Sequence, residues 1–322
     1  MKDSNGFSHK FEIFTYYKDN IQYIITPGLK TYLIYLIRIT DSFIFKALKG
    51  HNECISVLNY YQNSKNKSEE YILSVDIKGI LIIWDIFNDF KIRCKITTNE
   101  YVIFSSIIVF NINNKDNYII TSNSYQSENE VSSYSKIYSL PKGKHIKNIK
   151  NTNSNKTYYI LSWNDKKKDI FYEIECCFEK ISIINFLKNE IYHDFISENE
   201  EFTSGFVYNK HYKDYLCSSS IHGEIKFWDL ENKILENKIY SGDYNLQAMI
   251  QWSDKYIIFS GNNKSINKSF KILDIDQFKI ISNIGGKHTN PIICIKKIKH
   301  SIYGDILITS GNDNCIMIGD LN

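Results

Sequence analysis

The stretch Tyr215–Leu230, YLCSSSIHGEIKFWDL, contains a complete strand–turn–strand unit. An apolar beginning and a run of small residues lead to His222-Gly223, after which apolar and polar residues alternate up to Trp228-Asp229. Alternation is typical of half-buried strands, and a glycine in a short loop is typical of a hairpin turn. The stretch therefore predicts an antiparallel hairpin that ends on Trp-Asp.

The same pattern returns on both sides of this stretch. At 71–86 an apolar strand leads through Lys78-Gly79 to Trp84-Asp85, and at 306–321 a strand leads through 311–314 to Gly319-Asp320. Weaker copies occur elsewhere, with a period of roughly 40–45 residues. A unit of this length that begins near Gly-His and closes on Trp-Asp is typical of a WD40 β-propeller blade.

Seven units of about 44 residues account for nearly the whole chain of 322 residues. We therefore predict an all-β fold, in which residues 1–322 form a single seven-bladed propeller with four-stranded antiparallel blades. The predicted blades cover residues 7–49, 50–97, 98–150, 151–197, 198–241, 242–286 and 287–322. The last blade has only three predicted strands, so we expect the N-terminal segment 2–10, above all Phe7–Lys10, to supply the fourth and close the ring.

The chain resembles the WD40-repeat family. The repeat period extends the resemblance over the whole length, and strong motifs support it in three blades. The stretch 285–311 also resembles WD40 proteins of protists. In this family a hydrogen-bonded set links the Gly-His histidine, a strand Ser or Thr, a turn Asp and the Trp. The resemblance implies that no blade here keeps all four, because Lys78 and His222 stand at turn-Asp positions and Gly319 stands at a Trp position. The residues that carry the blade motif are Gly50, His51, Ser74, Trp84, Asp85, Ser218, Trp228, Asp229, His288, Thr309, Asp313 and Asp320.

The resemblance also implies a partner-binding set on one face of the propeller. In the family, contact residues lie three and five positions after the Gly-His histidine and just before the turn Asp, on loops that a rigid scaffold presents. Carried over, and with Gly242-Asp243 aligned to Gly-His, these positions are Cys54, Ser56, Ile77, Ile221, Leu246, Ala248, Pro291, Ile293 and Asn312. The set is mainly apolar, which suits a hydrophobic peptide anchor. The alternative, that several of these residues pack the central channel, stays open.

Charge and cysteine usage limit the functional classes. The net charge is +3 and the only arginines are Arg38 and Arg93, which argues against a specific nucleic-acid binder. The seven cysteines form no C-x-x-C pair and suit a reducing compartment. The N-terminus has no apolar signal region, and the apolar runs are too short to span a bilayer. We expect a cytoplasmic protein without membrane insertion, and a nuclear location stays open.

No catalytic, cofactor-binding or metal-binding constellation stands out in the sequence. The glycines lie singly at turns, and we expect His51, His222 and His288 to serve blade hydrogen bonds. The chain has no Arg-Arg pair, unlike phosphoinositide-binding propellers, and no Trp-Asp-x-Arg, unlike many ubiquitin-ligase receptors. Two hypotheses follow. The first is a non-catalytic scaffold or adaptor that binds a protein or peptide, and the alternative is an enzyme or ligand-binding protein that uses the central channel.

Overall fold

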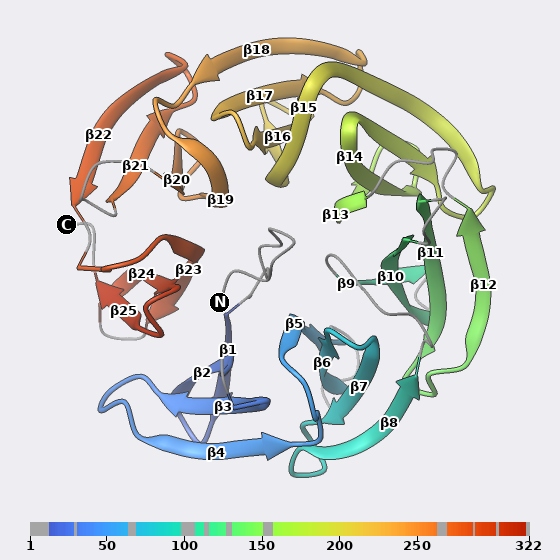
Figure 1. Ribbon diagram of the computed structural model, residues 1–322, viewed down its shortest axis with the longest axis vertical. Helices are drawn as coiled ribbons and strands as arrows, with labels where there is room; N and C mark the ends of the chain where they lie inside the picture. The colour runs from blue at the N-terminus through green and yellow to red at the C-terminus, as the bar shows by residue number, and fades with distance from the viewer. Residues whose placement is uncertain are drawn as a thin grey trace. The chain divides into compact units, whose positions relative to one another are not determined.

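The computed structural model describes residues 13–28, 31–63, 69–97, 107–112, 116–126, 131–150, 157–262, 269–285, 287–300 and 303–319. In these ranges the regular structure is β-strand, in six antiparallel sheets, and no helix occurs. Each sheet is built from strands that follow one another along the chain, as in the blades of a β-propeller (Figure 1). The described residues divide into two compact units, the first up to residue 160 and the second from residue 161 onward.

The first unit contains three four-stranded sheets, which follow the boundaries predicted for the first three blades. The strands of the first sheet are β1 (Phe14–Lys18), β2 (Ile21–Pro27), β3 (Leu33–Arg38) and β4 (Ile44–Lys49). Those of the second are β5 (Ile55–Gln62), β6 (Glu70–Asp76), β7 (Ile80–Asp85) and β8 (Lys91–Thr97). Those of the third are β9 (Ile107–Ile112), β10 (Asp116–Gln126), β11 (Val131–Leu140) and β12 (His145–Lys150).

The other three sheets have six, four and three strands, and the boundary between the two units falls within β13. The six-stranded sheet consists of β13 (Thr157–Asp165), β14 (Ile170–Asn185), β15 (Glu190–Lys210), β16 (Lys213–Ser220), β17 (Glu224–Asp229) and β18 (Ile234–Tyr240). The four-stranded sheet consists of β19 (Tyr244–Gln251), β20 (Tyr256–Asn262), β21 (Ser269–Asp274) and β22 (Lys279–Gly285). The three-stranded sheet consists of β23 (Ile292–His300), β24 (Gly304–Gly311) and β25 (Ile316–Gly319).

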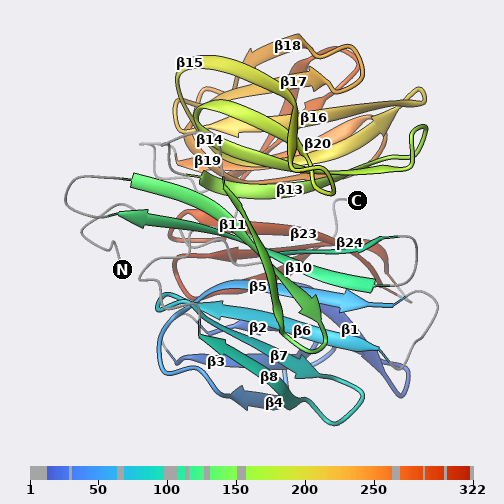
Figure 2. The same ribbon diagram turned by 90° about the vertical axis from the view of Figure 1, so that its right-hand side faces the viewer.

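The prediction of seven separate sheets is wrong, because the predicted fourth and fifth blades form one six-stranded sheet. β15 is 21 residues long: its first part pairs with β14, and its second part, from Phe202 onward, pairs with β16 (Figure 2). The stretch 197–201 is polar and contains the predicted blade boundary, yet β15 continues through it because both of its ends are held by strand pairing. The bend in this region lies at Glu179 and Asn199, whose φ angles are 59° and 57°.

The position of a strand within its sheet decides how it is buried. The third strand β7 is buried from Leu81 to Asp85, while the outer strand β8 is exposed at Lys91, Ile92 and Arg93 and only half-buried at Cys94. The same contrast separates β17 from β18. A middle strand has a neighbouring strand on each edge and apolar side chains on both faces, whereas an outer strand has one free edge. A continuous apolar run therefore predicts a middle strand here, and alternation predicts an outer one.

The hydrophobic core lies between successive sheets of each unit. In the first unit Leu48 of β4 packs in one cluster with Ile72 and Trp84 of the next sheet. In the second unit Phe227 of β17 packs in one cluster with Leu246 of β19 and residues of β20. Burying each such side chain contributes about 1.5–3 kcal/mol, and a sheet can bury both faces only against neighbours.

Two predictions fall outside the described residues. These are the closing strand from residues 2–10 and the role of Asp320. The last sheet has three strands in the described part of the chain, as the sequence predicts.

Candidate functional site

A complete hydrogen-bonded set occurs in the β5–β8 sheet, and it corrects the sequence-based prediction. His51 Nδ1 lies 2.9 Å from a carboxylate oxygen of Asp76, and His51 Nε2 lies 2.6 Å from the hydroxyl of Ser74. Trp84 Nε1–H donates to the same hydroxyl at 2.8 Å. The turn aspartate is therefore Asp76, not the position of Lys78, and this sheet keeps all four members. The sequence contained the signal: Asp76 stands two residues after Ser74 and just before the Lys78-Gly79 turn.

One arrangement of protons pairs every donor of this set with an acceptor. With the imidazole proton on Nδ1, His51 donates to Asp76, the Ser74 hydroxyl donates to Nε2, and Trp84 donates to the Ser74 oxygen. Asp76 also accepts the backbone N–H groups of Lys78 and Ile80 at 3.0 Å. The set thus joins the loop before β5 to β6, to β7 and to the turn between them.

A second set lies in the last sheet and lacks the tryptophan. His288 Nδ1 lies 3.0 Å from Oδ2 of Asp313, and His288 Nε2 lies 2.9 Å from the Thr309 hydroxyl. Asp313 also accepts the backbone N–H groups of Thr289 and Cys315. Gly319 lies opposite Leu307, two residues before Thr309, just as Trp84 lies opposite Ile72, two residues before Ser74. Gly319 therefore occupies the register position in the last sheet that Trp84 occupies in the β5–β8 sheet.

The six-stranded sheet keeps only the Trp–Ser part of the set. Trp228 Nε1–H donates to the Ser218 hydroxyl at 2.8 Å. In place of the histidine, the buried Lys226 forms ion pairs with Glu224 at 2.9 Å and with the buried Glu200 at 3.7 Å. Lys226 also donates to the Ser197 hydroxyl. A lysine on β17 therefore holds the segment that precedes the second half of β15.

The β19–β22 sheet repeats this lysine arrangement. Lys271 of β21 forms an ion pair with the buried Asp243 at 3.0 Å and donates to the backbone oxygen of Ser241 at 2.7 Å. Lys226 and Lys271 each lie three residues before an aspartate, Asp229 or Asp274, that caps the following turn. Sequence reasoning missed both lysines, although a lysine in the middle of a buried strand is a usable signal.

The aspartates of the Trp-Asp pairs act as turn caps. Asp85 accepts the backbone N–H of Asn88, and Asp229 accepts those of Glu231 and Asn232. Such a carboxylate replaces the backbone acceptor that the chain loses when it leaves a strand. This role explains why an aspartate closes the third strand.

One backbone hydrogen bond recurs at the same end of three sheets. In each case the N–H of a turn donates to a backbone carbonyl further back in the chain. In the β5–β8 sheet and the last sheet this carbonyl precedes the first strand, and in the six-stranded sheet it belongs to Glu201 in the middle of β15. The three pairs are Ile77 N to Cys54 O (2.9 Å), Ile221 N to Glu201 O (2.9 Å) and Asn312 N to Pro291 O (3.0 Å). We call this end, formed by these turns and the preceding loops, the turn face.

In the second unit the turn face is continuous from sheet to sheet. Asn245 N–H donates to the carbonyl of Ile221, and Ser241 N–H donates to that of Gly223. The Ser260 hydroxyl donates to the carbonyl of Ile292 in the last sheet at 3.0 Å. Gly223 has a φ of +86°, and a Cβ there would lie 1.8 Å from the backbone oxygen of Asp243. Only glycine therefore allows this close approach.

The nine predicted partner-binding residues differ in exposure. Asn312 is exposed, and Cys54, Ile77, Ile221 and Pro291 are half-buried. The others are buried, and they are Ser56, Leu246, Ala248 and Ile293. Leu246 and Ala248 belong to hydrophobic clusters between sheets. The structure thus brings Cys54 together with Ile77, and Pro291 together with Asn312. Contact of any of the nine with a partner stays a prediction.

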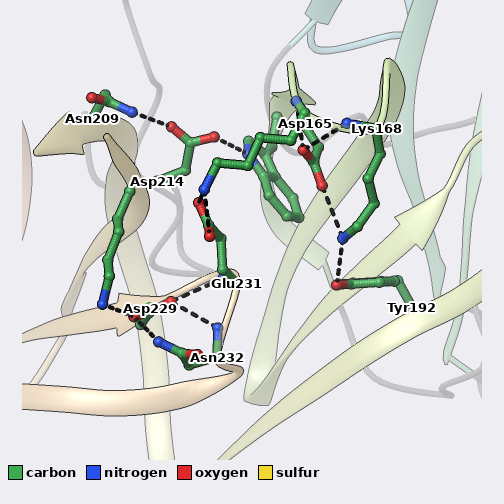
Figure 3. Close-up of polar contacts among 11 residues, drawn as sticks. Asp165, Lys168, Tyr192, Asn209, Asp214, Asp229, Glu231 and Asn232 are labelled. Atoms are coloured by element: carbon green, nitrogen blue, oxygen red, sulfur yellow. Dashed lines mark hydrogen bonds and ion pairs between the residues drawn. The ribbon is translucent and has the colours of Figure 1, made fainter. Parts of the chain in front are cut away.

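The opposite end of the six-stranded sheet carries a polar network (Figure 3). Asp214 accepts Trp163 Nε1–H at 2.9 Å and Asn209 Nδ2–H at 2.8 Å. Lys167 reaches both carboxylate oxygens of Glu231 at 2.7 Å. These contacts link the β13–β14 turn to residues beyond the bend in β15, and so stabilise the six-stranded arrangement.

Tyr192 lies between two lysines in the same region. Lys168 donates to the Tyr192 hydroxyl and pairs with Asp165 (Figure 3). The Lys233 ammonium lies 3.9 Å from the centre of the Tyr192 ring. The hydrogen bonds to Asp165 and Tyr192 raise the pKa of Lys168. Lys168 is paired with Asp165, and Lys233 donates to the backbone oxygen of Tyr192 at 3.3 Å, so the arrangement is that of a structural clamp.

No group of three or more His, Cys, Asp or Glu side chains with a metal-binding arrangement occurs in the part of the chain that the structure describes. Among the described residues, no helix is long and apolar enough to cross a membrane. No protein-family model and no curated protein matches the chain.

Proposed function

We propose that this protein is a non-catalytic WD40-type scaffold of the cytoplasm, whose turn face binds a peptide segment of a protein partner. It would act as a subunit or adaptor of a larger complex. The observation that carries the proposal is the repeated backbone hydrogen bond of the turn face. It holds a turn against the preceding loop in two sheets and against the middle of β15 in the six-stranded sheet. Rigid loops of this kind are where scaffolds bind partners.

The WD40 assignment is supported by the complete set of His51, Ser74, Asp76 and Trp84. As part of the proposal, the six-stranded sheet counts as two blades that divide at Glu179 and Asn199. Both residues have left-handed φ angles, and Asn199 N–H donates to the Glu179 carboxylate at 2.9 Å.

The proposed surface in the second unit consists of Ile221, Tyr244, Pro291 and Asn312. Tyr244 is 42% exposed and directly follows Asp243, the partner of Lys271. Apolar and aromatic groups held on rigid, hydrogen-bonded loops lose little conformational freedom on binding, which favours affinity.

The test compares affinity purifications of the wild-type protein and two turn-face variants, Ile221→Asp and Asn312→Arg, from the native cell. Proteins recovered with wild type are identified by mass spectrometry. We expect at least one partner to be lost with both variants, because a charge or a long side chain on this surface interferes with an apolar contact.

The matched control is Tyr212→Asp, at the opposite end of the sheet that carries Ile221. Tyr212 is 89% exposed and lies in the turn between β15 and β16. We expect this variant to keep every partner. If both turn-face variants also keep every wild-type partner, the turn face is not the binding surface.

A further inference from the structure

The outer strand of the first sheet, together with the residue before it, exposes an uninterrupted apolar run. Phe43 is 57% exposed, Ile44 is 52% exposed and Phe45 is 37% exposed. β4 is the terminal strand in the order β1-β2-β3-β4, so within the described residues its outer edge has no paired strand. Three consecutive exposed apolar residues on a free edge are a place where a further strand can add, because the edge leaves N–H and C=O groups unpaired.

Positive charge surrounds this edge. The Arg38 guanidinium lies 5.1 Å from the ring centre of Phe43, and the Lys18 ammonium lies 5.4 Å from that of Phe45. Lys46 bridges to Asp89 of the β7–β8 loop at 2.7 Å. The hydrogen bond and charge of Lys46 lower the pKa of Asp89, and the charges of Lys18 and Lys91 lower it further. Three lysines therefore converge on one carboxylate, beside the apolar run.

The nearby acidic groups cancel this charge only in part: the four cations Lys18, Arg38, Lys46 and Lys91 face the three carboxylates Asp19, Asp41 and Asp89. Asp41 is paired with Arg38 at 2.8 Å, and Asp19 follows Lys18 in the β1–β2 turn. The three outer strands of this unit carry seven lysines and arginines and no aspartate or glutamate: Lys46 and Lys49 in β4, Lys91, Arg93 and Lys95 in β8, Lys147 and Lys150 in β12. By contrast, the outer strand β18 of the second unit contains both Glu236 and Lys238.

We propose that β4 is a second docking surface, which takes an extended acidic segment of a partner protein as an added β-strand. The exposed run Phe43–Phe45 would contact apolar side chains of that segment, and Lys18, Lys46 and Lys91 would attract its carboxylates. A second copy of this chain is disfavoured there, because pairing of two lysine-bearing edges brings like charges together. A nucleic acid is disfavoured as well, because the only arginine at this surface, Arg38, is engaged by Asp41.

The test is a fluorescence-anisotropy titration with a fluorescein-labelled peptide of the sequence Glu-Val-Glu-Phe-Glu-Val-Glu-Phe. The probe alternates acidic and apolar residues, as an added strand on this edge requires. We expect the full-length protein to bind it, with an affinity that falls at least about tenfold between about 50 mM and about 500 mM salt. The same peptide with Lys in place of Glu should not bind.

Two variants locate the binding. Ile44→Asp adds a carboxylate to the exposed run, and Lys91→Glu reverses one of the converging charges. Each substitution should lower the affinity for the acidic probe by about tenfold or more. If Ile44→Asp alters the thermal unfolding midpoint, Phe43→Asp replaces it. The matched control is Ile234→Asp on β18, where Ile234 is 54% exposed, and it should bind like wild type.

The outcomes separate this proposal from that of the turn face. Ile221→Asp should leave the acidic probe bound, whatever its effect on partner recovery. Failure of the wild-type protein to bind the probe, equal binding of the lysine peptide, or equal weakening by Ile234→Asp would each overturn the β4 proposal.

Discussion

The β5–β8 sheet and the β19–β22 sheet use different side chains to hold the loop that precedes their first strand. Each must fasten the loop before its first strand to the strands behind it. In the β5–β8 sheet a histidine, a hydroxyl and an indole do this together with Asp76. In the β19–β22 sheet one lysine, Lys271, does it by pairing with Asp243. The six-stranded sheet combines the two, with the Lys226–Glu200 pair beside the Trp228–Ser218 bond.

The difference shows what the fold requires at this point. It requires that buried polar groups be paired and that the loop be held, but not one particular set of side chains. A hydrogen-bonded set with several members can lose one and leave the others paired, as in the last sheet, where His288, Thr309 and Asp313 remain without a tryptophan. A buried ion pair cannot, because removing one partner leaves a charge without compensation.

Lys226→Met should therefore have the largest effect of these substitutions. The side chains of Lys226 and Glu200 are 6% and 7% exposed, so the variant leaves a buried carboxylate without its lysine partner. We expect the free energy of unfolding to fall by about 3–5 kcal/mol. The measurement is urea unfolding followed by tryptophan fluorescence.

The double variant Lys226→Met/Glu200→Met is its control, because it removes both charges. It should recover most of the lost free energy. If the double variant is as unstable as the single one, the two charges do not compensate each other and the ion-pair explanation fails.

A second comparison removes the same hydroxyl from two sheets. Ser74→Ala deprives both His51 and Trp84 of a partner, while Ser218→Ala deprives Trp228 alone. Each unpaired buried group costs about 1–3 kcal/mol. We expect Ser74→Ala to lower the free energy of unfolding by about 2–4 kcal/mol and Ser218→Ala by about half as much, both measured by urea unfolding. Equal losses would show that His51 adds nothing to the set.

The polar network at the opposite end should matter much less. Lys167 is 61% exposed at its side chain, and its bridge to Glu231 is open to solvent. Lys167→Ala should lower the free energy of unfolding by about 0.2–1 kcal/mol, as exposed pairs do. Thermal unfolding of this variant and of wild type measures the difference. If its stability falls as much as that of Lys226→Met, the polar network contributes as much to the stability of the six-stranded sheet as the buried ion pair does.

The smallest expected effect is a pH dependence of stability, which arises from Asp313 in the last sheet. Burial alone would raise the pKa of Asp313, but the backbone N–H groups of Thr289 and Cys315, together with His288, bring that pKa below its usual value. A carboxylate with a lowered pKa in the folded state stabilises the protein above its unfolded pKa of about 3.9, and this contribution is lost as the pH falls through the lower folded value.

Asp313→Asn should consequently show a weaker loss of stability on acidification than wild type. Unfolding midpoints measured from about pH 5 down to about pH 2 test this. Parallel curves for the two proteins would mean that Asp313 contributes nothing to acid sensitivity.

The sequence predicted most of the strands but not all of their connections. The alternation around Trp228 and Trp84 predicted hairpins that the structure contains, because turn residues and strand periodicity act locally. β15 could not be predicted as one strand, because the polar residues 197–201 favour a loop locally and are kept within the strand by pairing with β14 and β16 on either side. The pair Lys226–Glu200 could not be predicted either, because it joins residues on different strands.

The site was predicted in part for the same reason. The histidines His51 and His288 and their hydroxyl partners follow from motif spacing, and the structure brings each pair within hydrogen-bonding distance. Asp76 was missed because the turn position was assigned to Lys78. Whether a turn-face residue is buried or exposed depends on the adjacent sheet, which a local pattern does not contain.

The measurement that tests the turn face most directly is amide hydrogen exchange at Ile77, Ile221 and Asn312. Each of these N–H groups donates to a backbone carbonyl, that of Cys54, Glu201 or Pro291, so we predict that all three exchange slowly in the native protein. Fast exchange at Ile221 and Asn312 would show that the loops and turns of the second unit are not held together, and would contradict the proposed binding surface.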